Sequence, residues 1–306
     1  MRKWLAAFAL VPVVACAASA SNEAEDDDDD STSTGTGGTG GGLNLGGSIS
    51  GGGGPTDTCS DEAKLIYVLS DTNQLYSFKP DERLFTLIGP LGCNTTMSPN
   101  SMAVDRDAVA WVNYVDGGLL GDNAGAIYRV STADASCEPT PAVTLPAGWY
   151  RIGMGYSTDG ANTDAETLFV TSIGLAGGLG RIDGPSLTPI GEFGGAFYGQ
   201  TAELTGTGDG RLFGFFTSTP VEVGEIDKAS AQVIANTPLP TVQVPSAWAF
   251  SFWGGDFYLY TANMGDSTVN RYRPSDGSVD TAYMTNIGFR IVGAGVSTCA
   301  PLQPPR

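Results

Sequence analysis

A short strand pattern recurs five times along this chain, and this recurrence limits its fold more than any other feature. Each copy has six residues, with apolar side chains at the first and fourth positions. The copies lie at residues 75–80, 127–132, 179–184, 223–228 and 269–274. They are spaced by 52, 52, 44 and 46 residues, as expected of a structural repeat.

Three further segments accompany each copy. A strongly apolar segment precedes it, at 65–69, 109–114, 167–171, 212–217 and 257–261. A more polar segment follows it, at 84–91, 137–145, 187–193, 232–239 and 280–287. A segment rich in small residues also recurs, at 100–105, 151–157, 200–206, 247–252 and 290–297. Four antiparallel strands per unit predict a five-bladed β-propeller over residues 59–302. A β-sandwich is the alternative, but it does not predict five copies of one strand order.

The small residues suit the innermost strand of each blade. Blades converge on a central axis, so this strand has the least room for side chains. The residues that meet this need are Ala103, Gly153, Gly155, Ala202, Ala249, Gly293 and Gly295. We therefore expect the inner strands of neighbouring blades to pack closely.

The order of the segments predicts how the ring closes. The first repeat has no small-residue strand before it, and the last such strand, 290–297, has no blade after it. We expect 290–297 to become the innermost strand of the first blade, a closure that removes free sheet edges.

The cysteines give a second prediction about closure. Four cysteines besides Cys16 suggest two disulfides in an exported chain, with three possible pairings. Closure brings Cys59 beside Cys299, while Cys93 leaves the outer strand of blade 1 and Cys137 enters that of blade 2. We therefore predict Cys59–Cys299 and Cys93–Cys137. Metal binding is the rival, but there is no CxxC spacing and no His.

The N-terminus is typical of an export signal. Residues 1–15 combine a basic start with an apolar run too short to span a bilayer. Residues 13–16 resemble a lipobox, which predicts lipid on Cys16 and an outer-membrane or cell-surface lipoprotein. The alternative is ordinary cleavage after 18–20 and free secretion. The acidic, Gly-rich segment 16–58 is predicted to be a disordered tether. Contact with the membrane would then occur only through the lipid anchor.

The net charge of −18 narrows the class of partner. Nucleic acid is excluded, because phosphate binding needs a basic face. The charge mainly favours solubility, and we expect a monomer.

The repeat also resembles that of exported bacterial propellers. Residues 75–80 read Leu-Tyr-Ser-Phe-Lys-Pro, and the next strand contains Phe-Thr-Leu-Ile-Gly at 85–89. This resembles the NHL, YVTN and lactonase-like groups over the whole of 59–302. The resemblance implies a propeller fold and export. Those groups commonly have six or seven blades, so this chain departs from them.

One mouth of the central channel is the predicted ligand site. Aligning the inner strands on their small residues places Ser101, Arg151, Gln200 and Arg290 at one level, with Tyr150 and Trp248 beside them. Paired arginines there would grip a carboxylate or phosphate, or help to bind a sugar. The alternative is that each arginine pairs with a neighbouring acid and fills the channel.

The residue types favour a non-catalytic role. Without His there is no Ser-His-Asp or Cys-His arrangement, and no catalytic residue is assigned. The inner strands offer two carboxyls, Asp105 and Glu203, and we expect Glu203 to face away from the axis. The predicted function is a surface-exposed binding or scaffolding module for an envelope protein or glycan.

The alternative is a calcium-dependent hydrolase or lyase acting at the channel mouth. The oxygen-rich loops 159–166 and 121–123 would supply the Asp and Asn ligands of its calcium ion. The sequence indicates no other cofactor. Neither loop matches an EF-hand, and runs of Asp and Asn are also ordinary turn chemistry.

Overall fold

The computed structural model describes residues 59–118, 121–172 and 177–305. The chain divides into two units, Met1–Thr39 and Gly40–Arg306, and the first lies wholly outside the described residues. The expected signal 1–15, the lipid site Cys16 and the tether 16–58 also lie outside them, and they stay predictions.

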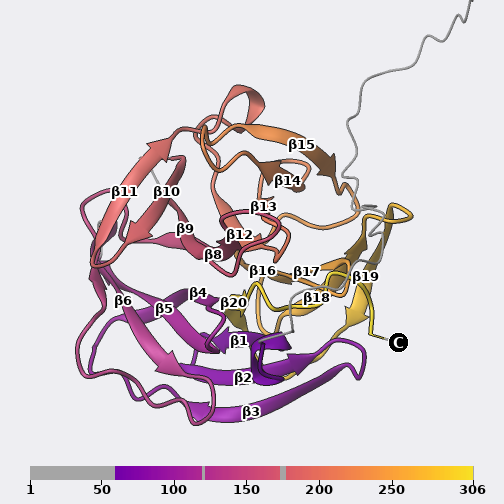
Figure 1. Cartoon of the computed structure of the whole chain (residues 1–306). Coiled ribbons are helices and arrows are strands. Elements are labelled where there is room, and N and C mark those ends of the chain that lie inside the picture. The colour runs from indigo at the N-terminus through magenta and orange to yellow at the C-terminus, as the bar shows by residue number, and fades with distance from the viewer. Residues whose placement is uncertain (1–58, 119–120, 173–176, 306) are drawn as a thin grey trace, which may run out of the picture. The chain divides into compact units, whose positions relative to one another are not determined.

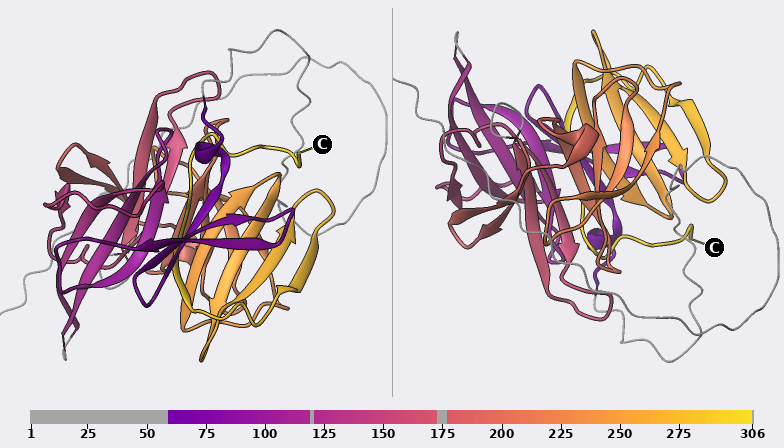
Figure 2. Two further views of the ribbon diagram at one scale, coloured as in Figure 1. Left: turned by 90° about the horizontal axis from the view of Figure 1, so that it is seen from below. Right: turned by 90° about the horizontal axis from the view of Figure 1, so that it is seen from above.

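The described residues form a five-bladed propeller, as predicted. Five sheets of four antiparallel strands stand around a central axis (Figures 1 and 2). Blade 1 contains β20 (Ile291–Val296), β1 (Ile66–Ser70), β2 (Gln74–Lys79) and β3 (Leu84–Pro90). Blade 2 contains β4 (Ser98–Val104), β5 (Val109–Gly118), β6 (Gly121–Ser131) and β7 (Val143–Thr144).

The other blades repeat this order from the axis outward. Blade 3 contains β8 (Ile152–Thr158), β9 (Glu166–Ser172), β10 (Leu179–Asp183) and β11 (Ser186–Gly191). Blade 4 contains β12 (Ala202–Gly206), β13 (Leu212–Phe216), β14 (Glu222–Ile226) and β15 (Val233–Pro238). Blade 5 contains β16 (Ala247–Trp253), β17 (Asp256–Ala262), β18 (Thr268–Arg273) and β19 (Ser278–Met284). Two short 3₁₀ turns, η1 (Glu62–Lys64) and η2 (Gly195–Phe197), interrupt the loops. Within the described ranges, no helix is long and apolar enough to cross a membrane.

The ring closes as expected. β20 pairs antiparallel with β1, so the last described strand is the innermost strand of the first blade.

The two predicted disulfides are also confirmed. Cys59 is bonded to Cys299 and Cys93 to Cys137, with Cα–Cα distances of 5.8 and 4.9 Å. The first disulfide therefore joins the segments that lead into β1 and out of β20.

Small residues let the inner strands approach one another. A Cβ on Gly155 of β8 would lie 2.8 Å from the carbonyl carbon of Leu204 in β12. A Cβ on Gly295 of β20 would lie 2.9 Å from the same atom of Ala103 in β4. Real Cβ atoms do not approach this closely, so these two positions need glycine. The prediction of slim inner strands is confirmed.

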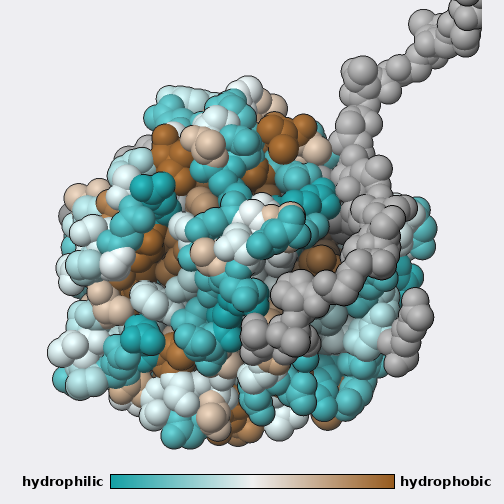
Figure 3. Space-filling model, viewed as in Figure 1, coloured by the Kyte–Doolittle hydropathy of each residue, from teal (hydrophilic) through white to brown (hydrophobic). Residues whose placement is uncertain are grey.

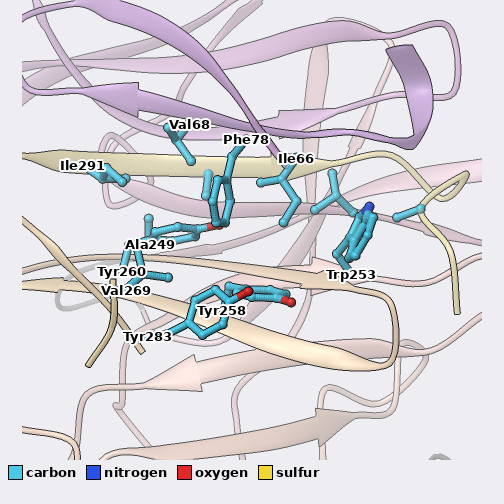
Figure 4. Close-up of a cluster of buried hydrophobic side chains, with 13 residues drawn as sticks. Ile66, Val68, Phe78, Ala249, Trp253, Tyr258, Tyr260, Val269, Tyr283 and Ile291 are labelled. Carbon is cyan, nitrogen blue, oxygen red and sulfur yellow. The ribbon is translucent and has the colours of Figure 1, made fainter. Parts of the chain in front are cut away.

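Larger side chains fill the space between blades. At the seam between blades 1 and 5, Phe78 packs edge-on against Tyr258 and Tyr260, with Ile66 and Val68 beside them (Figure 4). Each large apolar side chain buried in this way contributes roughly 1.5–3 kcal/mol. These residues come from the second and third strands of their blades, counted from the axis.

Blade 2 departs from the sequence prediction at its outer edge. A strand was expected over 137–145, but β7 is confined to Val143–Thr144, with one isolated bridge between Val130 and Cys137. Pro139 and Pro141 lie between the two pairings. Proline has no N–H to donate to a strand ladder, so the sequence itself interrupts this strand.

The surface in view in Figure 3 is mainly hydrophilic, and its hydrophobic residues form separate patches. The exposed large apolar side chains are likewise dispersed over different blades, for example Leu87 on β3 and Ile234 on β15. Single exposed apolar residues are common on soluble proteins and mark no docking face by themselves.

Candidate functional site

A small pocket lies where the first residues of the five inner strands meet. It has a volume of about 110 Å³. Its lining residues are Pro99, Asn100, Arg151, Glu203, Ser246, Ala247, Trp248 and Val292. Every blade contributes at least one of them, which puts the pocket on the central axis. We call it the axial pocket.

Glu203 corrects one sequence prediction. We expected it to face away from the axis because its neighbour Ala202 is small, but Glu203 lines the axial pocket. The reason is that Ala202 packs sideways against Gly153 of the adjacent inner strand. Successive side chains alternate along a strand, so the next residue points into the channel.

Glu203 is held by groups from other blades. The Ser101 hydroxyl on β4 donates to its Oε2 over 2.7 Å, and the Met154 backbone N–H also donates to the carboxyl. Only 1% of Glu203 is exposed. Burial raises the pKa of this carboxyl well above its usual range, although the two hydrogen bonds lower it. The neutral acid is therefore favoured, and a neutral acid is itself a hydrogen-bond donor.

Trp248 lines the same pocket with an unused donor. Its indole N–H is buried, and no acceptor for it exists among the described residues. A buried donor without a partner costs about 1–3 kcal/mol. Trp111 and Trp253, by contrast, donate to Asp105 and to the Lys64 carbonyl over 2.9 and 2.8 Å. The unmet donor at Trp248 is thus a local feature of the axial pocket.

Arg151 is engaged by a neighbouring acid. Its Nε and Nη2 donate to the two carboxylate oxygens of Asp122, over 2.8 and 2.9 Å. Its Nη1 donates to Asn100 Oδ1 over 2.7 Å, and Asn100 in turn donates to Asn113 and to the Ile152 carbonyl. From the sequence, the alternative to ligand binding was that each arginine pairs with a neighbouring acid. Arg151 does so, and its contacts with Asp122 and Asn100 join blades 2 and 3.

The remaining predicted residues lie in different environments. Arg290 donates to Ser246 Oγ over 3.2 Å, at the rim of the axial pocket. The Tyr150 carbonyl accepts from Asn113, and its ring packs against the core between blades 2 and 3. Gln200 lies in the turn after η2 and is not among the lining residues. Of the predicted set, Arg151 and Trp248 line the pocket, and Ser101 and Arg290 bond to residues that do.

A larger groove opens on blade 5 at the same end of the channel. It has a volume of about 360 Å³. Its lining residues are Thr241, Gln243, Thr261, Ala262, Asn263, Met264, Asp266, Thr268, Asn270 and Thr281. Ser246 connects it to the axial pocket, because its hydroxyl lies 3.2 Å from the Ala262 carbonyl and 2.9 Å from that of Asn263. Hydroxyl and amide groups dominate this blade-5 groove.

The opposite end of the inner strands carries a saturated polar cluster. Glu166 accepts from the Arg106 backbone N–H over 2.8 Å and from the Thr298 hydroxyl over 2.7 Å. Arg106 pairs with Asp164 over 2.7 Å, and its guanidinium also reaches Cys59 Sγ. Burial raises the pKa of Glu166 to about 7. We call these residues, with the Cys59–Cys299 disulfide, the closure cluster.

The oxygen-rich loops considered for calcium are occupied by such contacts. Asp164 and Glu166 belong to the closure cluster, Asp159 accepts from Thr167, and Asp122 binds Arg151. In the part of the chain that the structure describes, no three His, Cys, Asp or Glu side chains are grouped in a way that would hold a metal ion.

No protein-family model matches the chain, and no curated protein matches its sequence. Several solved structures are similar in fold. One is a nidogen/laminin complex, with 11% identity and a TM-score of 0.49, covering 78% of this chain and 99% of that one. Another is a gluconolactonase from Xanthomonas campestris, with 14% identity and a TM-score of 0.42, covering 64% and 68%. TolB from Acinetobacter baumannii has 16% identity and a TM-score of 0.42, covering 72% and 53%. Propellers host many unrelated functions, so these likenesses assign none to this chain.

Proposed function

We propose that the propeller is a non-catalytic binding module of an exported protein, and that its ligand enters the axial pocket. One observation carries this proposal: a pocket on the axis is lined by Trp248, whose buried N–H has no acceptor among the described residues. A ligand atom that accepts this hydrogen bond would remove the cost of leaving the donor unpaired. Two disulfides support export, because such bonds persist in oxidising compartments. Display on a lipid-anchored tether through Cys16 is part of the proposal.

The two titratable groups that line the pocket favour an uncharged ligand group with acceptor oxygens. Glu203 is held neutral by burial, and Arg151 is neutralised by Asp122. The donors left for a ligand are the Trp248 N–H and the hydroxyl of a protonated Glu203. A carbonyl, hydroxyl or acetamido oxygen satisfies such donors without adding a buried charge.

The size of the two cavities favours an extended ligand. About 110 Å³ holds only a terminal group, while the blade-5 groove of about 360 Å³ begins beside Ser246. Its hydroxyl and amide lining suits a polyhydroxylated chain. We therefore propose a glycan of the cell envelope as ligand, with its end in the axial pocket and its next units in the groove.

A catalytic role is the second candidate, because Glu203 is a buried acid with a raised pKa at the pocket wall. Such a group is suited to general acid catalysis. Glycosidases use a second carboxyl beside the first, however, and Glu203 is the one carboxyl among the pocket-lining residues of the described chain. The geometry therefore supports binding better than hydrolysis.

The test is an array of bacterial-envelope glycans, followed by calorimetry with N-acetylglucosamine oligomers. Trp248→Phe removes the unpaired N–H and keeps an aromatic ring, so we expect at least fivefold weaker binding from the loss of one buried hydrogen bond. Gln200→Ala is the matched control, since Gln200 was predicted for the site but is not a lining residue. Equal affinities for the two variants would contradict the proposal. Product release that disappears in Glu203→Gln would favour the catalytic candidate.

A further inference from the structure

A third cavity lies at the seam between blades 1 and 5, at the opposite end of the blades from the axial pocket. It has a volume of about 260 Å³. Its lining residues are Asp81, Trp253, Gly254, Asp256, Tyr258, Arg271, Arg273, Tyr283, Pro304 and Pro305. Figure 4 shows three of its aromatic residues, Trp253, Tyr258 and Tyr283, beside the apolar core of this seam. We call it the seam pocket.

Two arginines of the seam pocket share one carboxylate without a direct hydrogen bond. The Nε atoms of Arg271 and Arg273 lie 3.8 and 3.6 Å from Asp256 Oδ2. Both distances exceed the usual length of a charge-assisted hydrogen bond. Arg211 forms a contrasting pair, because two of its nitrogens donate to the carboxylate of Glu225 over 2.9 and 2.6 Å.

The donor capacity of Arg271 is partly unmet. Its side chain is only 16% exposed. Its Nε is buried and has no acceptor among the described residues. The guanidinium is held in place by stacking, since its central carbon lies 4.4 Å from the centre of the Tyr283 ring. Arg83 stacks on the same ring at 4.5 Å. Arg271 is therefore a fixed, desolvated donor at the wall of a cavity.

Asp256 is the main competitor for these donors. Several charged or titratable groups surround it: Arg271, Arg273 and Asp276 from β18 and its following turn, Asp81 and Arg83 from the turn after β2, Tyr258 from β17 and Tyr283 from β19. Burial raises the pKa of Asp256 to about 6, although nearby Arg271 lowers it. Near and below this pH Asp256 loses its charge, and the acids that remain near the two arginines are Asp276 and Asp81.

We propose that the seam pocket binds a small oxyanion, either a carboxylate or a sulfate or phosphate group, through the guanidinium groups of Arg271 and Arg273. The oxygens of such an anion would accept the donors that neither Asp256 nor the Tyr258 hydroxyl accepts. Trp253 and Tyr258 would wall the anion off from part of the solvent, which strengthens a charge-assisted bond. This site is separate from the axial pocket, and it does not depend on the function proposed for that pocket.

The first experiment titrates the full chain with sodium sulfate at constant ionic strength, using chloride as the balancing ion. The backbone amide signals of Asp256 and Arg271 are followed by NMR, and we expect saturable shifts. Inorganic phosphate and sodium acetate are titrated in parallel. Tighter binding of acetate assigns the site to carboxylates, and tighter binding of sulfate or phosphate assigns it to tetrahedral anions.

The variants compare a seam arginine with an ordinary surface arginine. Arg273→Gln removes one of the two guanidinium groups. The Arg273 side chain is partly exposed, so the variant should keep its fold. We expect about tenfold weaker sulfate binding. Arg181→Gln is the control, because Arg181 is about as exposed and pairs with Asp183 on β10. It carries the same change in charge and should leave the affinity unchanged.

The pH dependence gives an independent readout. Sulfate stays ionised, so its affinity should rise as the pH falls from about 7.5 to about 5 and Asp256 takes up a proton. Asp256→Asn should bind sulfate more tightly at about pH 7.5 and lose this dependence. No saturable binding of any of the three anions would overturn the proposal. It would also fail if Arg273→Gln and Arg181→Gln had equal affinities, or if Asp256→Asn kept the pH dependence.

Discussion

The two ends of the inner strands each hold a glutamate, half-buried at one end and fully buried at the other, and they use it differently. Glu166 at the closure cluster accepts from Arg106 and Thr298, which come from blades 2 and 1, and so ties three blades together. Glu203 at the axial pocket accepts from Ser101 and shares the pocket lining with Trp248, whose N–H has no acceptor among the described residues. At one end the carboxylate has hydrogen-bond donors from two other blades, whereas the other end keeps a donor without an acceptor among the described residues.

This contrast shows that burial of a carboxyl does not by itself mark a functional site. Burial raises the pKa of both Glu166 and Glu203. What separates them is the set of neighbours: an arginine and a disulfide surround the first, and a cavity adjoins the second. A ligand site is therefore better recognised by donors without acceptors than by a perturbed acid alone.

The largest expected effect tests the structural role of the closure cluster. Replacing both Cys59 and Cys299 by serine should lower the free energy of unfolding by about 2–5 kcal/mol, measured by urea denaturation. The matched control replaces Cys93 and Cys137. Their sequence separation is 44 residues against 240, so the chain-entropy model predicts a loss about 1.5 kcal/mol smaller. An equal or larger loss in the control would show that closure does not depend on this end.

An intermediate effect tests the raised pKa of each of the two glutamates. Each has a folded pKa above its unfolded value, so its contribution to stability is full below about pH 4.5 and is lost as the pH rises through the folded pKa. One such group contributes at most about 1.4 kcal/mol per pH unit. In Glu166→Gln the urea midpoint should fall less steeply with rising pH than in the parent protein, up to about pH 7. Above that pH the two slopes should be equal. In Glu203→Gln the urea midpoint should also fall less steeply than in the parent once the pH exceeds about 4.5, because burial raises the pKa of Glu203 as well. A parent-like profile in either variant would show that its carboxyl has no raised pKa in the folded protein.

The smallest expected effect compares two tryptophans. Trp253→Phe removes an indole N–H that donates to the Lys64 carbonyl near the closure cluster, whereas Trp248→Phe removes one that has no acceptor in the described chain. Thermal unfolding should show Trp253→Phe to be the less stable variant by about 1 kcal/mol, the value of one hydrogen bond. If Trp248→Phe were the less stable of the two, its N–H would have a structural partner after all.

The fold was readable from the sequence because its constraints repeat. Small residues near the axis and apolar strands outside them recur in every blade. The strand 290–297 has no blade after it, so it could only complete the first blade. The expected strand at 137–145 was wrong because two prolines remove donors from it. The repeat therefore predicts the strands that all blades share, whereas Pro139 and Pro141 shorten the outer strand of blade 2 alone.

The site was less readable because it depends on contacts between distant blades. Glu203 was assigned to the wrong side, since the sequence does not say that Ala202 packs sideways on Gly153. The partner of Arg151 was expected only as some neighbouring acid, and Asp122 comes from another blade. Arg271 and Arg273 do share a strand face by their spacing. Their shared acid Asp256, however, lies on β17, outside that strand.

The closure of blade 1 by β20 has a consequence for biosynthesis. Until Ile291–Val296 has emerged, β1 has no inner partner, and its edge is open to pairing with another chain. Folding of the ring must therefore wait until Ile291–Val296 has been synthesised, however early the middle blades form. A chain that stalls before this strand would leave an unsealed blade, and we expect it to be a preferred substrate for chaperones and proteases.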